Sequence, residues 1–177
     1  MSDRNGQARA LNIFTPIRPG EEQALHTYLA DLGRGPASPL ARSTRTHFAR
    51  WVIIDRLPTE CVPKPDRLRR IQLLFTSSFD GDQRSYLEDL VDVLAAEVPE
   101  VWGRCEGCPG LSMPAALVNW LLDHRVRSSF FVAAYNKSTV QDVRNALAAR
   151  EQALAFALRA QELDAGDRLQ AFRKVFP

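Results

Sequence analysis

The chain of 177 residues is long enough for one domain with an appended helical element. Its 45% hydrophobic and 25% charged residues are typical of a globular protein, and a formal charge of +2 is too small to favour nucleic acid or an anionic membrane. The first ten residues lack the apolar core of a signal peptide, and no run approaches the roughly 18 apolar residues of a membrane span. We therefore expect a cytoplasmic protein with reduced thiols.

The first third of the chain predicts two strands with a helix between them. Ala10–Ile17 alternates in polarity and carries β-branched residues, which favours a strand. Apolar residues at helical spacing predict a helix over 22–32, which Gly33 ends. His47–Leu57 reads as a second strand, and the three prolines of Pro58–Asp66 predict a turn or an exposed connection.

The middle of the chain repeats this order. Arg69–Phe75 predicts a third strand, and residues 77–82 have the composition of a loop and helix cap. A helix is expected over Gln83–Glu97, and a shorter one over Ala115–Asp123. Ser128–Tyr135 then reads as a fourth strand.

The remaining residues form a helical tail. A long alanine-rich helix is predicted from residue 138 or 139 to about Leu163, followed by a final amphipathic piece over Leu169–Phe176. The expected organisation is a flexible N-terminus (1–9), an α+β domain (10–136) and a C-terminal helical extension (137–177). The order strand, helix, strand, strand, helix, strand is that of a ferredoxin-like βαββαβ sandwich with an antiparallel sheet.

The predicted strands carry large apolar residues on both faces. In the second strand, Phe48 and Val52 share one parity while Trp51 and Ile53 share the other. A sheet with one face in water alternates more cleanly than this. We therefore expect the second face to be covered, either by the same face of a second copy in a homodimer, which is the leading interpretation, or by the C-terminal helices.

Two polar residues are candidates for catalysis. His47 begins the second strand and could act as a general base or ligate a haem iron, although a strand histidine bonded to a backbone carbonyl is the commoner arrangement. Asp80 could act as a proton shuttle or simply cap the following helix. Strict alternation places Arg50 on the opposite face from His47 unless a bulge intervenes, so Arg50 is expected to be a surface arginine or to form an ion pair, with Asp55 or a neighbouring strand.

Other motifs are weaker. Cys105 and Cys108 form a C-x-x-C, which can be a redox pair or half of a zinc site, but no second cluster of ligands accompanies it. We expect two incidental loop thiols and no metal. Arginines at 42–50 and 67–70 could bind an anion or RNA, although the predicted strands lack the glycine and aromatic signature of RNA-binding sheets.

The segments LNIFTPIRPG (11–20), THFARWVIID (46–55) and LLFTSSFDGD (73–82) resemble an uncharacterised bacterial family near the dimeric α/β-barrel superfamily. That superfamily includes antibiotic-biosynthesis-type monooxygenases, chlorite dismutase-like proteins and dye-decolourising peroxidases. The resemblance to the peroxidases is partial. Their G-x-x-D-G motif matches 77–81 only in Asp80-Gly81, with Ser77 in place of the first glycine.

The resemblance implies a small-molecule-binding protein or oxidoreductase-like enzyme, with haem or an aromatic ligand held between the sheet and its cover. His47 would be the polar group inside, Asp80 would lie at the rim, and Trp51 and Phe131 would line the cavity. The alternative is a non-catalytic assembly module, and a weaker one is anion or RNA binding through the arginines. His124 is a second conceivable haem ligand, supported by its residue type alone.

Overall fold

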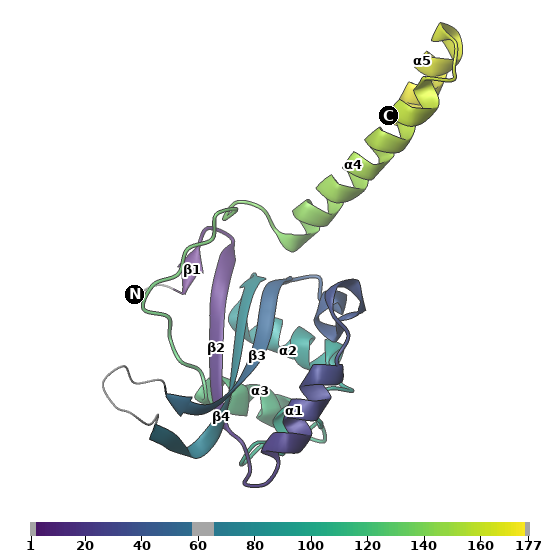
Figure 1. Ribbon diagram of the computed structural model, residues 1–177. Helices are drawn as coiled ribbons and strands as arrows, with labels where there is room; N and C mark the ends of the chain where they lie inside the picture. The colour runs from purple at the N-terminus through teal and green to yellow at the C-terminus, as the bar shows by residue number, and fades with distance from the viewer. Residues whose placement is uncertain (1–2, 58–65, 176–177) are drawn as a thin grey trace. The chain divides into compact units, whose positions relative to one another are not determined.

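The first part of the chain is an α+β unit built on a four-stranded antiparallel sheet (Figure 1). The computed structural model describes residues 3–57 and 66–175. The strands are β1 (Arg4–Asn5), β2 (Ala8–Pro16), β3 (Thr46–Leu57) and β4 (Asp66–Asp80), in the spatial order β1-β2-β4-β3. The predicted connection Pro58–Asp66 lies outside the described residues except for Asp66, which begins β4.

Three α-helices accompany this sheet: α1 (Glu22–Asp31), α2 (Gln83–Val93) and α3 (Pro114–Asp123). Short 3₁₀ helices lie at Gly35–Ala37, Pro39–Arg42 and Trp102–Arg104. The sequence predicted the three α-helices at these places, although α2 ends four residues earlier than the expected Glu97. Among the described residues, none of the helices is long and apolar enough to cross a membrane.

One face of the sheet packs against the helices and forms the core. The odd-numbered residues in the middle of β2 and in the second half of β4 point to this face and are buried: Leu11, Ile13, Thr15, Leu73, Phe75, Ser77 and Phe79. Phe75 packs edge-on against Trp102 with ring centroids 5.4 Å apart, and Phe79 stacks on Tyr86 at 4.0 Å. The apolar part of this core is Leu11, Ile13, Ile17, Leu25, Leu73, Phe75, Phe79, Tyr86, Leu87, Leu90, Val91, Leu94, Val98, Val101, Trp102, Cys105, Leu117, Val118 and Leu121.

Strand β4 is longer than the sequence predicted. Residues 77–80 were expected to form a loop, but they continue the strand to Asp80, paired on both sides with β2 and β3. The polar residue Ser77 is accommodated in the core because its hydroxyl lies 2.6 Å from the Tyr86 hydroxyl. A buried polar side chain that is hydrogen-bonded carries little penalty, so the serines did not end the strand.

The predicted fourth strand, Ser128–Tyr135, is wrong: these residues have no regular structure. The chain does follow the free edge of β2, since Val126 N donates to Asn12 O over 2.8 Å. Farther along, however, the edge is already occupied. The N-terminal residues form β1 there, and Ala10 N donates to Asp3 O over 2.8 Å. With those backbone groups paired, residues 128–135 cannot form a regular ladder with β2.

The second face of the sheet carries no helix of this unit. Its even-numbered residues include Phe48 and Val52 on β3, which are 80% and 37% exposed. Phe130, from the irregular segment beside β2, is 84% exposed. The expectation of large apolar residues on both faces is therefore met.

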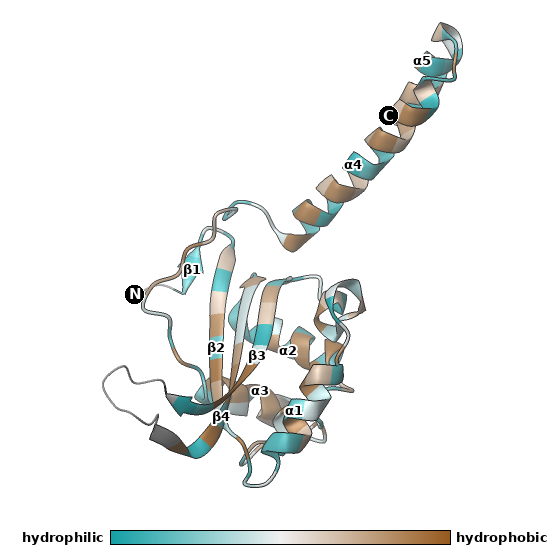
Figure 2. Cartoon of the chain, in the orientation of Figure 1, coloured by the Kyte–Doolittle hydropathy of each residue, from teal (hydrophilic) through white to brown (hydrophobic). Residues whose placement is uncertain are grey.

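The second unit of the chain begins at Val140, and most of its described residues are helical. It contains α4 (Val140–Ala160) and α5 (Ala165–Val175), whose rings Phe156 and Phe172 pack edge-on at 5.7 Å. Hydrophobic and hydrophilic positions alternate along α4 (Figure 2). The sequence predicted both helices, with α4 ending three residues before the expected Leu163.

Candidate functional site

The open face of the sheet holds a histidine–aspartate pair at one end of β3 and β4. His47 Nε2 lies 2.8 Å from Asp80 Oδ1, and the two side chains are only 16% and 12% exposed. Because a carboxylate accepts and does not donate, Nε2 carries the proton and Nδ1 is left as the basic nitrogen. Among the described residues, nothing is hydrogen-bonded to Nδ1. Such an imidazole can accept a proton from a ligand.

A β-bulge produces this pairing. Thr46 is opposite Phe79 and Phe48 is opposite Ser78, so His47 is an extra residue on β3. Without the bulge, alternation would send His47 to the helix-covered face. With it, Thr46 points to the core, where its hydroxyl lies 3.0 Å from the Tyr86 hydroxyl, and the His47 ring reaches Asp80 on the open face.

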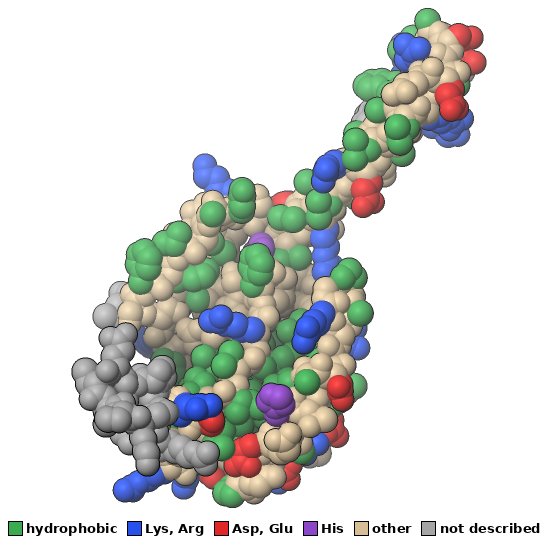
Figure 3. All heavy atoms as spheres, in the orientation of Figure 1, with side chains coloured by type: hydrophobic (Ala, Val, Ile, Leu, Met, Phe, Trp, Pro, Cys, Tyr) green, Lys and Arg blue, Asp and Glu red, His purple; other side chains and the backbone are tan. Residues whose placement is uncertain are grey.

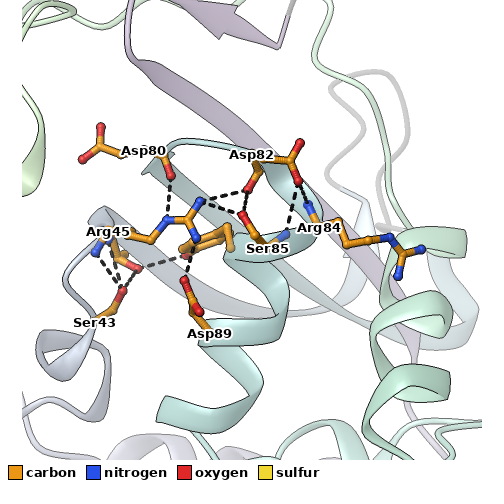
Figure 4. A network of polar contacts seen from close by, with 9 residues as sticks. Ser43, Arg45, Asp80, Asp82, Arg84, Ser85 and Asp89 are labelled. Atoms are coloured by element: carbon orange, nitrogen blue, oxygen red, sulfur yellow. Dashed lines mark hydrogen bonds and ion pairs between the residues drawn. The ribbon is translucent and has the colours of Figure 1, made fainter.

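Arg45 fixes the two strand ends that carry the pair (Figure 4). Asp80 N donates to Arg45 O over 2.9 Å, and Arg45 Nε donates back to Asp80 O over 3.0 Å. Its terminal nitrogens reach Asp82 O at 3.0 Å and Asp89 Oδ2 at 2.6 Å. Figure 4 shows the Asp80 carboxylate pointing away from this guanidinium. Arg45 therefore holds the backbone of Asp80, while the carboxylate of Asp80 contacts His47.

The helix cap that the sequence assigned to Asp80 belongs to Asp82. The carboxylate of Asp82 accepts from the backbone N–H groups of Arg84 and Ser85 at 3.0 and 3.2 Å. The hydrogen bond from Ser85 is the main reason that the pKa of the Asp82 carboxyl lies below its usual value. Gly81 makes the turn between the two aspartates with φ +88°, and a Cβ there would come within 2.5 Å of Arg45 Nη2.

A groove of about 500 Å³ crosses the open face beside the pair. In Figure 3 hydrophobic side chains lie around a hollow on this side of the unit, with basic side chains near it. Its lining comes from all three long strands and from the irregular segment after α3: Ala10, Asn12, Phe48, Ala49, Arg50, Thr76, Ser77, Ser78, Ser128, Phe130 and Phe131. Neither His47 nor Asp80 is part of this lining: His47 directly precedes Phe48 on β3, and Asp80 lies two residues after Ser78 on β4.

The two predicted lining residues lie in different places. Phe131 does line the groove. Trp51 does not: it faces the helices, where its ring centroid lies 5.5 Å from that of Phe75 and 6.0 Å from that of Trp102. The bulge is the reason, because it separates the faces of His47 and Trp51, which strict alternation would have placed together.

Arg50 shares the face of His47, as the sequence allowed only if a bulge intervened. Its Nε donates to Thr76 Oγ1 on the neighbouring strand over 3.1 Å. The alternative partner, Asp55, lies 3.5 Å from Arg56 instead. Sequence reasoning placed Arg50 outside the site, and no feature of the sequence marks the bulge that brings it in.

The C-x-x-C lies on the helix-covered side of the sheet, where Cys105 belongs to the core and Cys108 packs against it. Burial raises the pKa of the Cys105 thiol from 9.0 to about 11, and burial also raises that of Cys108. Both thiols are free. Reactive cysteines have lowered pKa values, so this environment is that of structural thiols.

The two histidines considered as haem ligands lie in different surroundings. His47 is bonded to Asp80 through Nε2, so Nδ1 is the nitrogen that a haem iron would have to bind. His124 ends α3, with Nδ1 2.8 Å from Trp120 O and its ring 4.5 Å from that of Trp120. In the part of the chain that the structure describes, no group of three or more His, Cys, Asp or Glu side chains is placed to hold a metal ion.

Comparison with known proteins adds no relative: no family model, no curated protein and no solved structure matches this chain.

Proposed function

We propose that the protein is a small-molecule-binding protein or enzyme of the dimeric α/β-barrel type, with a ferredoxin-like first unit and an aromatic ligand bound in the groove of the open sheet face. The observation that carries this proposal is the His47–Asp80 contact of 2.8 Å beside the groove. The order β2-β4-β3 and the helices on a single face support the ferredoxin-like assignment.

The chemistry we propose is proton transfer. His47 takes a proton from the ligand at Nδ1, and the resulting imidazolium is stabilised by the Asp80 carboxylate at Nε2. Asp80 also fixes the tautomer and orientation of the ring, as carboxylates do for catalytic histidines. The low exposure of both side chains strengthens this interaction, because it keeps bulk water from screening it.

We propose that a second copy of the chain covers the open face. Phe48 and Phe130, which flank the groove, are 80% and 84% exposed, and Tyr135 is also 84% exposed. Large exposed apolar side chains that lie close together mark interaction sites. Two such faces packed together would enclose the groove and remove these rings from water. The same rings favour the second candidate function, a non-catalytic assembly module.

The test is a titration of the full-length protein with 2-naphthol, an aromatic probe with an acidic hydroxyl, followed by ¹⁵N NMR of the backbone and histidine rings. Binding should move the backbone signals of the groove residues and the Nδ1 signal of His47, while the His26 ring, outside the groove, serves as the control. If the groove signals move and Nδ1 of His47 does not, His47 has no role in proton transfer.

Light scattering separates the two candidate functions. A dimer that binds the probe supports the ligand-binding function, whereas a dimer whose groove signals ignore the probe supports the assembly module. Phe48→Ser should weaken the dimer, because it removes an exposed ring from the proposed interface. A wild-type chain that stays monomeric at micromolar concentration would refute the facing-sheet dimer.

A further inference from the structure

The lining of the groove on the open face carries few charges, and all of its charge is positive. Its lining contains one charged side chain, the guanidinium of Arg50, and no carboxylate. The other polar groups of the lining are hydroxyls and one amide, and the apolar part is formed mainly by Phe48, Phe130 and Phe131. A site with one fixed positive charge and three phenyl rings is complementary to a ligand that has an aromatic body and one negative charge.

Arg50 is positioned to bind the negatively charged group of such a ligand. Its Nε is bonded to Thr76 Oγ1, which fixes the side chain from the neighbouring strand. Among the described residues, none pairs with its two terminal nitrogens, and the nearest carboxylate along β3, that of Asp55, is taken by Arg56. A guanidinium anchored at Nε presents its remaining donors as a fork that matches a carboxylate.

The rings lie on two sides of this guanidinium. Phe48 is two residues from Arg50 on β3, so both side chains point to the open face. Phe130 and Phe131 come from the irregular segment on the β2 side, which is anchored by the 2.9 Å hydrogen bond from Asn12 Nδ2 to Ser128 Oγ. A volume of about 500 Å³ is ample for one or two fused rings.

We propose that the ligand of the groove is an aromatic carboxylate, whose ring packs between Phe48 and the Phe130–Phe131 segment and whose carboxylate binds Arg50. This inference rests on the proposed function, since it names the ligand class of the same groove. It also orients the ligand: with the carboxylate on Arg50, the rest of the molecule extends along β3 towards His47.

The experiment compares 2-naphthoate with its neutral isostere 2-naphthamide by isothermal titration calorimetry on the full-length protein. Wild type should bind 2-naphthoate at least about tenfold more tightly than 2-naphthamide, because one charge-assisted hydrogen-bonded pair contributes about this factor to affinity. Arg50→Gln should remove this preference. Arg56→Gln is the matched control, because it removes the same charge from the same strand outside the groove, and it should leave the preference unchanged.

Each outcome decides a separate point. Equal binding of the two probes, unchanged by Arg50→Gln, overturns the anionic preference and leaves an aromatic-binding groove in place. If Arg50→Gln and Arg56→Gln lose affinity for 2-naphthoate equally, the anionic preference is also overturned, since the loss would then reflect the overall electrostatic field of the protein. If neither probe binds and no groove signal moves in NMR spectra, both the preference and the proposed ligand-binding function fail.

Discussion

The buried thiol of Cys105 gives a sharp test of the core, because its ionisation is coupled to folding. Its Sγ lies 3.3 Å from Thr15 Oγ1 and the residue is 2% exposed. Burial disfavours the thiolate and raises the pKa from 9.0 to about 11, although the hydrogen bond with Thr15 acts in the opposite direction. The perturbation that we propose is a rise in pH from neutral to strongly alkaline.

The direction in which pH changes the stability of the fold follows from proton binding. The folded protein holds the Cys105 proton more tightly than the unfolded chain does, so the thiol contributes stability that is fully present below pH 9.0 and is lost as the pH rises through about 11. This difference in pKa corresponds to about 3 kcal/mol at most, of which roughly half is lost by pH 10.

The assay is urea unfolding in reducing buffer between pH 7.5 and 10.5, followed by tryptophan fluorescence. All three tryptophans lie in the first unit, so the signal reports on the core that contains Cys105. Wild type should lose about 1 kcal/mol more than Cys105→Ala by pH 10. Cys108→Ala keeps the Cys105 thiol and should therefore keep the loss of stability that Cys105→Ala removes. Parallel pH profiles for wild type and Cys105→Ala would refute the reasoning.

Two further predictions concern the polar contacts near the site. Arg45→Gln should lower the free energy of unfolding by about 2–3 kcal/mol, because it removes several hydrogen bonds around a side chain that is only 23% exposed. Arg84→Gln is the control and should cost less than about 0.5 kcal/mol, since its ion pair is exposed; equal losses would contradict the role of Arg45. Tyr86→Phe should cost about 1–3 kcal/mol because it leaves the buried Ser77 hydroxyl without its partner, whereas Tyr135→Phe, at an exposed ring, should change nothing measurable in the same urea assay.

The sequence predicted the elements whose apolar residues recur at a clear period. Strands β2 and β3 and helices α1 to α5 lie within a few residues of their predicted bounds, because apolar residues recur in each at the spacing of its type of element. The prediction was wrong where a tertiary contact replaced the expected partner. Ser77 stays in a strand because Tyr86 satisfies it, and residues 128–135 are irregular because β1 occupies the edge of β2.

The candidate site was predictable in its residue types and not in its geometry. His47 and Asp80 were both chosen from the sequence, yet nothing in the sequence placed them in contact. Strict alternation put His47 on the face of Trp51 and put Arg50 on the opposite face. A single extra residue in β3 reverses this arrangement, since a shift of one residue exchanges the two faces of a strand.

The two departures from regular structure act together to build the groove. A regular strand over 128–135, paired with β2, would alternate its side chains, so Phe130 and Phe131 would point to opposite faces. In the irregular segment both rings line the groove. On the other side, the bulge turns His47 towards the face that carries Phe48 and Arg50. These irregularities bring phenyl rings, a guanidinium and an imidazole to one face of the sheet. Departures from regular structure of this kind are expected at functional sites. This is the physical reason for seeking the ligand on the open face and not among the buried thiols.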